Sequence, residues 1–547
     1  MDKSKQINLI LFISAVAFTL FSMFPSFFEL ATREKLPPHR YFTLEHNYLF
    51  DYNFYLSRIR QGMEGKWLVT EKYFNRTHQE SLFQIVYLYF GKLGGLFRLE
   101  PAAVYHLSRA VFGLALLLTT VKFGRRYLSG KYLLLFFLFA TTSGSWPILV
   151  TSGGFYRFAT YMGWWSVIDS LQRITIMPHI LIGQLFLILF ILKFSEPHKT
   201  GLKQIFLWGL LGNAAGIIFP PTLIICFAFF AVQSLMELLG SHKILLKPFI
   251  QKNLLPRFVF ALTILPSLVY LQLMFKVMPW SALALFDIEH RMSIPYREYA
   301  LALGPILPLG LAGLALVFIR GEKKYFPAVS WILAVALLFI VFENVPQQSP
   351  LRFTEGLIHV PLALLSVYFF LRLKGKVRPF LLKIASGAIV LTGLLVMVSM
   401  VLWLTDQGRA KRYGTWKVPI GAELVYPLDD FMKALFYLRE NTGRDQVVLS
   451  FVTAGNYIPA YAGNYVYIGH ANTPREDRKE IEVARFFKGE FGKDEAEGFI
   501  RREEISLVFY GPQEKAFGSF PDLAAVYPFL QKVYSNPEVI LYRVPEK

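Results

Sequence analysis

The sequence predicts a polytopic α-helical membrane protein that ends in an α/β domain. The 547-residue chain is 54% hydrophobic and only 17% charged, with a mean hydropathy of +0.41, which is too apolar for a soluble globular protein of this size. Apolar runs of spanning length recur as far as residue 404. Beyond it, short β-branched and aromatic runs alternate with helical stretches. We therefore predict a transmembrane domain over residues 1-404 and an α/β domain over residues 405-547.

The first apolar run, Ile7–Leu30, is predicted to be a retained span. It is too long for the apolar core of a signal peptide, and no small-residue cleavage site stands out after it. Counting it, the sequence predicts about eleven spans, and an odd number places the termini on opposite sides of the membrane. The later runs are Ala102–Phe123, Tyr132–Val150, His179–Phe194, Ile205–Phe219, Thr222–Leu239, Phe258–Phe275, Leu301–Ile319, Phe326–Phe342, Leu357–Leu371 and Ile384–Leu404.

The basic residues predict the orientation. A formal net charge of +19 would suggest nucleic acid in a soluble chain, but here Lys and Arg lie largely in short loops between apolar runs. That placement indicates topology and anionic lipid headgroups, so no nucleic-acid partner is expected. Because five basic loops fall on the side of Lys3 and Lys5, we predict a cytoplasmic N-terminus and an extracytoplasmic C-terminal domain. These loops contain Lys122, Arg125, Arg126, Lys131; Lys193, Lys199, Lys203; Lys243, Lys247, Lys252, Arg257; Arg320, Lys323, Lys324; and Arg372, Lys374, Lys376, Arg378.

The segment Ser81–Phe97 is apolar enough to be a further span. Counting it as one would invert every later loop, so an amphipathic or re-entrant helix on the outer face fits the basic residues better. This interpretation leaves three long outer loops, at residues 31–101, 151–178 and 276–300.

The C-terminal region is predicted to be a small α/β sandwich of Rossmann-like layout, because strands and helices alternate in it. A glycine C-cap at Gly443 is expected to end its first helix. No G-x-G-x-x-G motif follows a strand, so nucleotide binding is not supported. The expected strands are Val447–Phe451, Tyr465–Ile468, Leu507–Tyr510 and Val539–Arg543, and the expected helices are Leu428–Glu440, Arg478–Phe487, Asp494–Arg502 and Leu523–Tyr534.

The first outer loop contains the strongest candidate for chemistry, Asp51. Its spacing to Tyr55 and Arg58 is helical, so Asp51 is placed at the start of an interfacial helix whose positive end favours the ionised carboxylate. Such a carboxylate can bind a divalent cation or act as a base. In the alternative interpretation, Asp51 caps the helix and pairs with Arg58. Glu45 and His46 lie nearby, either as support for the site or as solvated loop residues.

The second outer loop supplies one further carboxylate, Asp169. Arg173 follows one helical turn later, and His179 follows Pro178 at the mouth of the next span. Asp169 is a candidate catalytic residue, although Asp169 and Arg173 are equally compatible with a simple i,i+4 pair. His179 is either a supporting residue of the site or an interface residue.

Two ionisable residues lie near the outer entry of the tenth span. Arg352 and His359 stand where unpaired charge is costly and functional residues are over-represented. An arginine there can hold a lipid phosphate through two hydrogen bonds. The alternative is that Arg352 extends toward the membrane surface or pairs with Glu355.

Several of these stretches resemble a known fold family. The pattern Phe50-Asp51-x-x-x-Tyr55 in the first outer loop, with a glycine a turn or two beyond, resembles membrane glycosyltransferases of the GT-C fold. These include oligosaccharyltransferase catalytic subunits and protein mannosyltransferases. The chain looks most similar to uncharacterised bacterial GT-C-like membrane proteins. The stretches that carry this similarity are Tyr55–Gly62, Pro178-His179, Arg352–Gly356 and Gly469-His470.

The resemblance implies an inverting glycosyltransferase in the plasma membrane that moves a sugar from a polyprenyl-phosphate donor to an extracytoplasmic glycan, lipid or protein. Asp51 would be the base or a metal ligand, and Asp169 would be the second acidic residue. Arg352, with His359 near it, would hold the donor phosphate. A divalent cation, Mg²⁺ or Mn²⁺, could then be bound by Asp51 and Asp169. The chain lacks an Asp-x-Asp pair and the W-W-D-Y-G sequence, which argues against Asn-linked glycan transfer and leaves metal dependence open.

Two other functions remain open from the sequence. A lipid or glycan transporter, or flippase, should have polar residues at mid-membrane in broken helices, and the break at Phe219–Thr222 lies where an outer turn is expected. A non-catalytic membrane protein would use the exported domain for binding. Within that domain, Tyr457–Pro459 and Tyr467–His470 are either acceptor contacts or parts of a stabilising cap.

Overall fold

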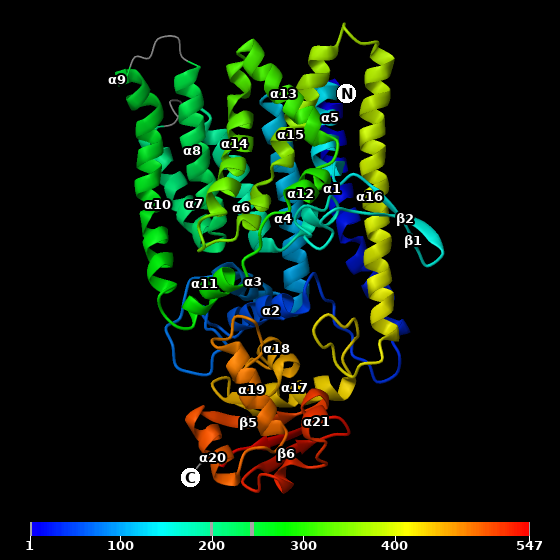
Figure 1. The fold of residues 1–547 in the computed structure, drawn as a ribbon, viewed down its shortest axis with the longest axis vertical. Coiled ribbons are helices and arrows are strands. Elements are labelled where there is room, and N and C mark those ends of the chain that lie inside the picture. Colours follow the sequence, from blue (N-terminus) through cyan, green and yellow to red (C-terminus); the bar gives the residue numbers. More distant parts are fainter. Residues whose placement is uncertain (1–2, 197–200, 241–245, 546–547) are drawn as a thin grey trace. The chain divides into compact units, whose positions relative to one another are not determined.

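The computed structural model describes residues 3–196, 201–240 and 246–545, and its chain divides into two compact units (Figure 1). The helical unit comprises Met1–Phe24, Leu107–Gln272 and Asp287–Trp403, and the mixed unit comprises Pro25–His106, Leu273–Phe286 and Leu404–Lys547. The chain passes for the last time from the helical unit to the mixed unit between Trp403 and Leu404, next to the expected boundary after residue 404. However, most of the first outer loop also belongs to the mixed unit. The boundary between the two domains therefore stays a prediction.

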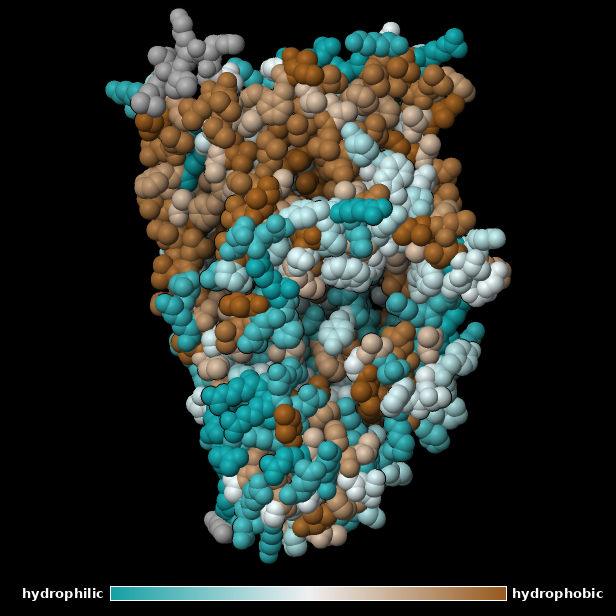
Figure 2. Space-filling view, viewed as in Figure 1, coloured by the Kyte–Doolittle hydropathy of each residue, from teal (hydrophilic) through white to brown (hydrophobic). Residues whose placement is uncertain are grey.

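The chain is a multi-pass membrane protein by helix length and composition. Within the described residues, six helical segments are long and apolar enough to cross a bilayer, and two bent pairs raise this number to as many as eight. The six segments are Lys5–Ala31 in α1 (Lys3–Ala31), α4 (Pro101–Arg125), α8 (Pro221–Leu239), Lys247–Met274 with α9 (Leu246–Phe249) and α10 (Leu255–Met274), Lys323–Phe342 with α14 (Phe326–Phe342), and α16 (Pro379–Tyr413). On the face drawn in Figure 2, hydrophobic side chains cover most of the surface of these helices.

The two bent pairs and three shorter helices account for the other expected spans. The pairs are α12 (Tyr296–Ala302) with α13 (Ile306–Arg320), bent by 91°, and η6 (Pro350–Gly356) with α15 (His359–Leu373), bent by 52°. The shorter helices are α5 (Gly130–Thr142), α6 (Pro178–Phe194) and α7 (Leu202–Ile218). Even 17 residues span only about 25 Å, less than the roughly 30 Å of a typical hydrocarbon core. The count of eleven therefore stays a prediction, as does the orientation, and Lys199 and Lys243 lie outside the described residues.

One expected span is wrong in its second half. The run Tyr132–Val150 is helical only as far as Thr142 in α5, and a hairpin of β1 (Ile148–Ser152) and β2 (Phe155–Ala159) follows it. Gly153 and Gly154 form the turn with φ angles of 59° and 81°, which side chains with a Cβ rarely adopt. Average hydropathy hides this turn, because the first strand is as apolar as a helix would be.

The segment Ser81–Phe97 contains a short apolar helix, and its place on the outer face stays a prediction. This helix, α3 (Ile85–Leu96), has 12 residues and so spans about 18 Å. It packs closely on α2 (Leu49–Met63), because a Cβ on Gly62 would lie 1.9 Å from the Leu88 carbonyl oxygen and a Cβ on Gly91 would lie 1.9 Å from that of Ile59. The two glycines thus let the backbones of these helices touch and fix the direction of α2.

A five-stranded sheet forms the centre of the mixed unit, in the order β4-β3-β5-β7-β6. Strands β4, β3 and β5 are parallel, and β7 and β6 complete the sheet in antiparallel fashion. Each of the four expected runs forms a strand. The strands are β3 (Val447–Leu449), β4 (Tyr465–Val466), β5 (Ile505–Tyr510), β6 (Gln531–Ser535) and β7 (Ile540–Arg543). The helices around them are α17 (Asp429–Asn441), α18 (Val452–Tyr461), α19 (Glu476–Phe487), α20 (Lys493–Arg502) and α21 (Pro512–Gly518).

Two expectations for this region are wrong. The run Leu523–Tyr534 is a short 3-10 turn followed by strand β6, because Pro528 interrupts the helix that its composition suggests. The first helix, α17, ends at Asn441 with extended Thr442 as its C-cap, so Gly443 is not the capping glycine. Helices α18 and α21 are not foreseen from the sequence, since the first contains Pro459 and the second is only seven residues long.

Candidate functional site

Asp51 lies in the first turn of α2, as its spacing predicts. The N-cap is Tyr48, and no side chain makes a capping hydrogen bond there, so Asp51 is not the cap. Its side chain is 43% exposed. A carboxylate in this position is favoured by the positive end of the helix and stays accessible to a substrate.

His470 contacts Asp51 from the loop after β4. Its Nε2 atom lies 3.4 Å from Oδ1 of Asp51, and the histidine side chain is only 5% exposed. The backbone N–H of Asn472 donates to Nδ1 over 3.1 Å. Because Nδ1 accepts this hydrogen bond, Nε2 is the ring nitrogen that can donate toward Asp51, but in the geometry observed Nε2 makes no hydrogen bond with any described residue. The imidazole also stacks on Phe54, with ring centroids 4.5 Å apart, which fixes its plane.

The contact between α2 and His470 is supported by hydrogen bonds of two asparagines. Asn53 donates to Oδ1 of Asn456 over 2.8 Å, and Asn456 donates to the carbonyl oxygen of Phe50 over 3.2 Å. Helix α18 also abuts the loop before His470, since a Cβ on Gly455 would lie 1.9 Å from the Ile468 carbonyl oxygen. These contacts hold the start of α2 and the loop of His470 in one fixed arrangement.

Arg58 and Tyr55 are buried parts of this arrangement. Arg58 donates to Glu71 over 2.9 Å, and its guanidinium lies 3.4 Å from the centre of the Phe54 ring. The alternative in which Arg58 pairs with Asp51 is therefore wrong. Tyr55 stacks on Tyr87 with centroids 4.5 Å apart, so it is a packing residue beneath the exposed carboxylate.

Glu45 and His46 are not solvated loop residues. Glu45 lies 3.2 Å from Nζ of Lys411, which also pairs with Glu29 over 3.0 Å, and all three side chains are at most 10% exposed. Nδ1 of His46 lies 3.1 Å from the hydroxyl of Tyr105. Both residues therefore belong to the buried support of the mixed unit.

In the helical unit, Asp169 shapes a turn. Its Oδ1 accepts hydrogen bonds from the backbone N–H groups of Leu171 (3.1 Å) and Gln172 (2.8 Å). Oδ2 is buried and has no hydrogen-bond partner among the residues that the structure describes. Burial raises the pKa of the Asp169 carboxyl above its usual value.

Arg173 is bonded to the backbone. Its guanidinium donates to the carbonyl oxygens of Ala140, Thr141 and Ser143, at the end of α5, over 3.0, 3.2 and 2.7 Å. Burial lowers the pKa of Arg173 to about 10. Arg173 thus holds the second outer loop to α5.

Arg352 lies in η6, a segment held by side chains from three directions. Trp165 donates to the Thr354 hydroxyl (2.8 Å), Trp331 to the Gly356 carbonyl (2.7 Å) and Gln184 to the Glu355 carbonyl (3.0 Å). The guanidinium of Arg352 lies 3.5 Å from Asp287 and 3.7 Å from Glu355 and remains 37% exposed. The predicted pair of Arg352 with Glu355 is thus present, while part of the Arg352 guanidinium stays accessible.

The two candidate histidines of the helical unit, His179 and His359, lie at the starts of helices. His359 begins α15 and lines, with Arg173, a cavity of about 20 Å³. His179 is buried at the start of α6, and its ring lies 5.8 Å from that of Phe219. Their roles as phosphate-binding or supporting residues stay predictions.

The residues available do not form a complete metal site within either unit. Over residues 3–196, 201–240 and 246–545, no group of three His, Cys, Asp or Glu residues is arranged to hold a metal ion. Asp51 and His470 together supply one carboxylate and one imidazole, fewer ligands than Mg²⁺ or Mn²⁺ usually takes. A cation bound by Asp51 and Asp169 therefore stays a prediction.

Sequence reasoning missed two partners of its own candidates. His470 was singled out only in a Gly-His stretch and as an acceptor contact, and Asp287 of the third outer loop was not considered. Both partners are separated by long stretches of sequence from Asp51 and Arg352. The one signal in the sequence is that His470 and Asp287 are ionisable residues in segments predicted to be exported.

Comparisons with known proteins identify the fold. No family model matches the chain, and no curated protein matches its sequence. Among solved structures, the archaeal oligosaccharyltransferase AglB from Archaeoglobus fulgidus is similar over 100% of this chain and 75% of its own, with a TM-score of 0.51 and 13% identity. ArnT from Cupriavidus metallidurans is similar over 98% of both chains, with a TM-score of 0.52 and 10% identity. Arabinofuranosyltransferase AftD from Mycobacteria is similar over 98% of this chain and 42% of its own, with a TM-score of 0.50 and 12% identity.

At these identities the similarity shows the fold alone. It covers nearly the whole of this chain in each case and includes an oligosaccharyltransferase and an arabinofuranosyltransferase. By its fold, the chain is a GT-C-like membrane protein.

Proposed function

We propose that this protein is a membrane glycosyltransferase that moves a sugar from a polyprenyl-phosphate donor to an extracytoplasmic acceptor. The acceptor is a glycan, a lipid or a protein. The observation that carries the proposal is the half-exposed Asp51 at the positive end of α2, with Nε2 of His470 3.4 Å from its Oδ1, in a chain of GT-C-like fold. The AglB structure with a similar fold is a complex with a dolichol-phosphate, which supports a donor of this class.

In the proposed reaction, Asp51 is the base. Its carboxylate takes the proton of the acceptor hydroxyl as the acceptor oxygen bonds to the anomeric carbon. The bond from that carbon to the lipid phosphate breaks, the phosphate leaves with the electron pair, and the configuration at the carbon inverts. Nε2 of His470 lies beside Oδ1 of Asp51, and we propose that it donates to this oxygen in the substrate complex, so that Oδ2 is presented to the acceptor. His470 is thus a positioning residue.

Arg352 is proposed to stabilise the leaving phosphate. Its guanidinium is 37% exposed, so a phosphate can reach it beside the carboxylates of Asp287 and Glu355. His359 near it and Asp169 as a second acidic residue remain part of the proposal. We also propose that the chain lies in the plasma membrane, crosses it eleven times, and has a cytoplasmic N-terminus and an exported C-terminal domain.

The test is sugar transfer by the purified full-length protein in lipid, over a panel of polyprenyl-phosphate sugars, with donor cleavage as the readout. Asp51→Asn is compared with Asp494→Asn, a matched control that alters an exposed carboxylate in the first turn of α20. Turnover that is lost only in Asp51→Asn supports the proposal. Turnover unchanged in Asp51→Asn refutes the site, and no turnover of any donor by folded wild type refutes the enzyme.

One observation favours a second function, a lipid or glycan transporter. Broken spans are a feature of transporters, and the helical unit contains two bent helix pairs. A liposome assay that follows a fluorescent lipid between leaflets distinguishes the two functions. Movement of lipid without donor cleavage would favour the transporter.

A further inference from the structure

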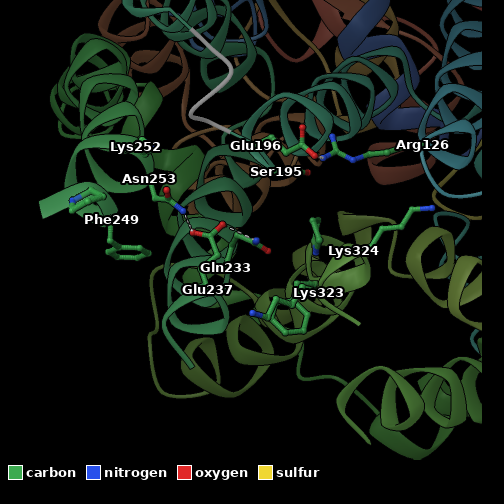
Figure 3. A pocket seen from close by; sticks show the side chains of 13 residues that line it. Arg126, Ser195, Glu196, Gln233, Glu237, Phe249, Lys252, Asn253, Lys323 and Lys324 are labelled. Atoms are coloured by element: carbon green, nitrogen blue, oxygen red, sulfur yellow. Dashed lines mark hydrogen bonds and ion pairs between the residues drawn. The ribbon is translucent and has the colours of Figure 1, made fainter. Parts of the chain in front are cut away.

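A pocket of about 590 Å³ lies among helix ends of the helical unit (Figure 3). Four basic residues line it, Arg126, Lys252, Lys323 and Lys324, together with apolar side chains such as Phe249 and Phe326. All four cations come from the basic loops that the sequence places on one side of the membrane. A pocket with this lining can hold an anion next to an apolar group.

The acidic residues of the pocket are already neutralised by arginines. Glu196 pairs with Arg126 over 2.8 Å, and Glu237 pairs with Arg257 over 2.7 Å. Nζ of Lys324 donates to the Tyr127 carbonyl oxygen over 3.1 Å and has further protons to donate.

Lys252 and Lys323 remain as positive charge without a partner. Neither makes an ion pair or a side-chain hydrogen bond with any residue in the described part of the chain. The pocket therefore keeps a net positive charge after its internal pairs are formed.

Gln233 adds a second, independent sign of a ligand. This residue of α8 is only 2% exposed and lines the pocket, where Figure 3 shows its amide beside the carboxylate of Glu237. Its Nε2 donates to Glu237 over 2.9 Å, which fixes the amide orientation and leaves Oε1 to accept. Oε1 is buried and has no hydrogen-bond partner among the described residues. An unpaired buried acceptor of this kind calls for a donor from outside the chain.

The pocket lies at the depth of lipid headgroups. Gln233 and Glu237 belong to the last turns of α8, which ends at Leu239, and Phe326 begins α14. Both helices are long and apolar enough to span the membrane, so their ends meet the region where lipid phosphates lie.

We propose that this pocket binds the headgroup of an anionic phospholipid whose phosphodiester carries a hydroxyl group, as in phosphatidylglycerol. The lysines contact the phosphate, and a headgroup hydroxyl donates to Oε1 of Gln233. The apolar side chains cover the glycerol backbone where the acyl chains leave. The site is separate from the residues proposed for sugar transfer, and the proposal does not depend on that activity.

The charge part is tested by lipid binding to the purified full-length protein in phosphatidylcholine, measured by native mass spectrometry as phosphatidylglycerol is added. Lys252→Ala/Lys323→Ala should weaken phosphatidylglycerol binding about tenfold or more. The control Lys374→Ala/Lys376→Ala removes two exposed lysines outside the pocket and should leave binding unchanged. Equal weakening in both double variants, or in neither, overturns the proposal.

The hydroxyl part is tested by comparing phosphatidylglycerol with phosphatidylmethanol, which has the same charge but no headgroup hydroxyl. Wild type should prefer phosphatidylglycerol, and Gln233→Leu should bind the two lipids equally. Thermal unfolding in phosphatidylcholine alone checks that the variant is folded. A preference that survives in folded Gln233→Leu, or none in wild type, contradicts the role of Gln233.

A final arm separates a lipid from a free phosphate. Glycerol 3-phosphate presents the same phosphate and hydroxyls in solution. Thermal stabilisation by the lipid but not by millimolar glycerol 3-phosphate supports a lipid site. Equal stabilisation by both would assign the pocket to a soluble phosphate compound and overturn the lipid proposal.

Discussion

Asp51 in the mixed unit and Asp169 in the helical unit are similar in sequence context but very different in structure. Both are lone carboxylates in loops predicted to lie outside the cytoplasm, next to apolar helices. Asp51 is 43% exposed, and its side chain is contacted by one histidine. Asp169 is buried, and its Oδ1 is occupied by two backbone N–H groups.

This difference shows how a local backbone decides the use of a carboxylate. Asp51 lies inside the first turn of a helix and is not its capping residue. Its carboxylate oxygens therefore remain available for chemistry. Asp169 lies in an irregular turn whose backbone N–H groups have no helical partner. Its carboxylate therefore accepts hydrogen bonds from them. Residue type alone does not separate the two cases.

The largest expected effect is on turnover in Asp51→Asn. Because an amide cannot take a proton from the acceptor, turnover should fall about 100- to 10,000-fold, while donor binding changes little. Single-turnover kinetics with a polyprenyl-phosphate sugar measure the loss. A fall confined to KM would show that Asp51 binds substrate and is not the base.

A smaller effect is expected at His470. His470→Leu removes the imidazole that lies beside Oδ1 of Asp51 and is proposed to donate to it during transfer, so turnover should fall about tenfold to a hundredfold. His470→Gln can again present an N–H group to Asp51 and should recover most of the loss.

The double variant Asp51→Asn/His470→Leu makes this test sharper. Because His470 acts through Asp51, the double variant should be no slower than Asp51→Asn alone. Fully additive losses would mean that His470 acts independently of Asp51.

Asp169 should matter more for stability than Asp51 does. Asp169→Ala leaves two buried N–H groups without an acceptor, which should lower the free energy of unfolding by about 1–3 kcal/mol. Asp169→Asn keeps an oxygen for them and should lose much less. Thermal unfolding in lipid measures both. A large loss of turnover in a fully stable Asp169→Asn would instead establish Asp169 as a second catalytic carboxylate.

The parts of the fold that follow from local pattern were predictable. Apolar runs gave the helices, β-branched runs gave β3, β4, β5 and β7, and helical spacing placed Asp51 on the first turn of α2. The failures have local causes that hydropathy hides. A Gly-Gly turn divides the run Tyr132–Val150, and Pro528 breaks the expected last helix.

The candidate site was predictable only in part, because its contacts join distant segments. The sequence points to Asp51, but it is equally compatible with a pair between Asp51 and Arg58. The structure shows that Arg58 pairs with Glu71 instead. Glu45 looked like a loop residue because its partner Lys411 belongs to the far end of the last long helix. Long-range pairing of this kind is set by packing, and a single sequence does not display it.

The smallest expected effect concerns pH and sharpens the comparison at Asp169. Burial raises its pKa in the folded protein, so the folded state favours the protonated form more than the unfolded chain does. The resulting stability is fully present below the unfolded value near 4 and is lost as pH rises through the folded pKa. Asp169→Asn does not titrate, so the difference in melting temperature between wild type and this variant should shift against wild type as pH rises from about 4. A difference that stays constant with pH would mean that Asp169 is ionised in the folded protein as readily as in water, and the contrast with the exposed Asp51 would then lie in hydrogen bonding alone.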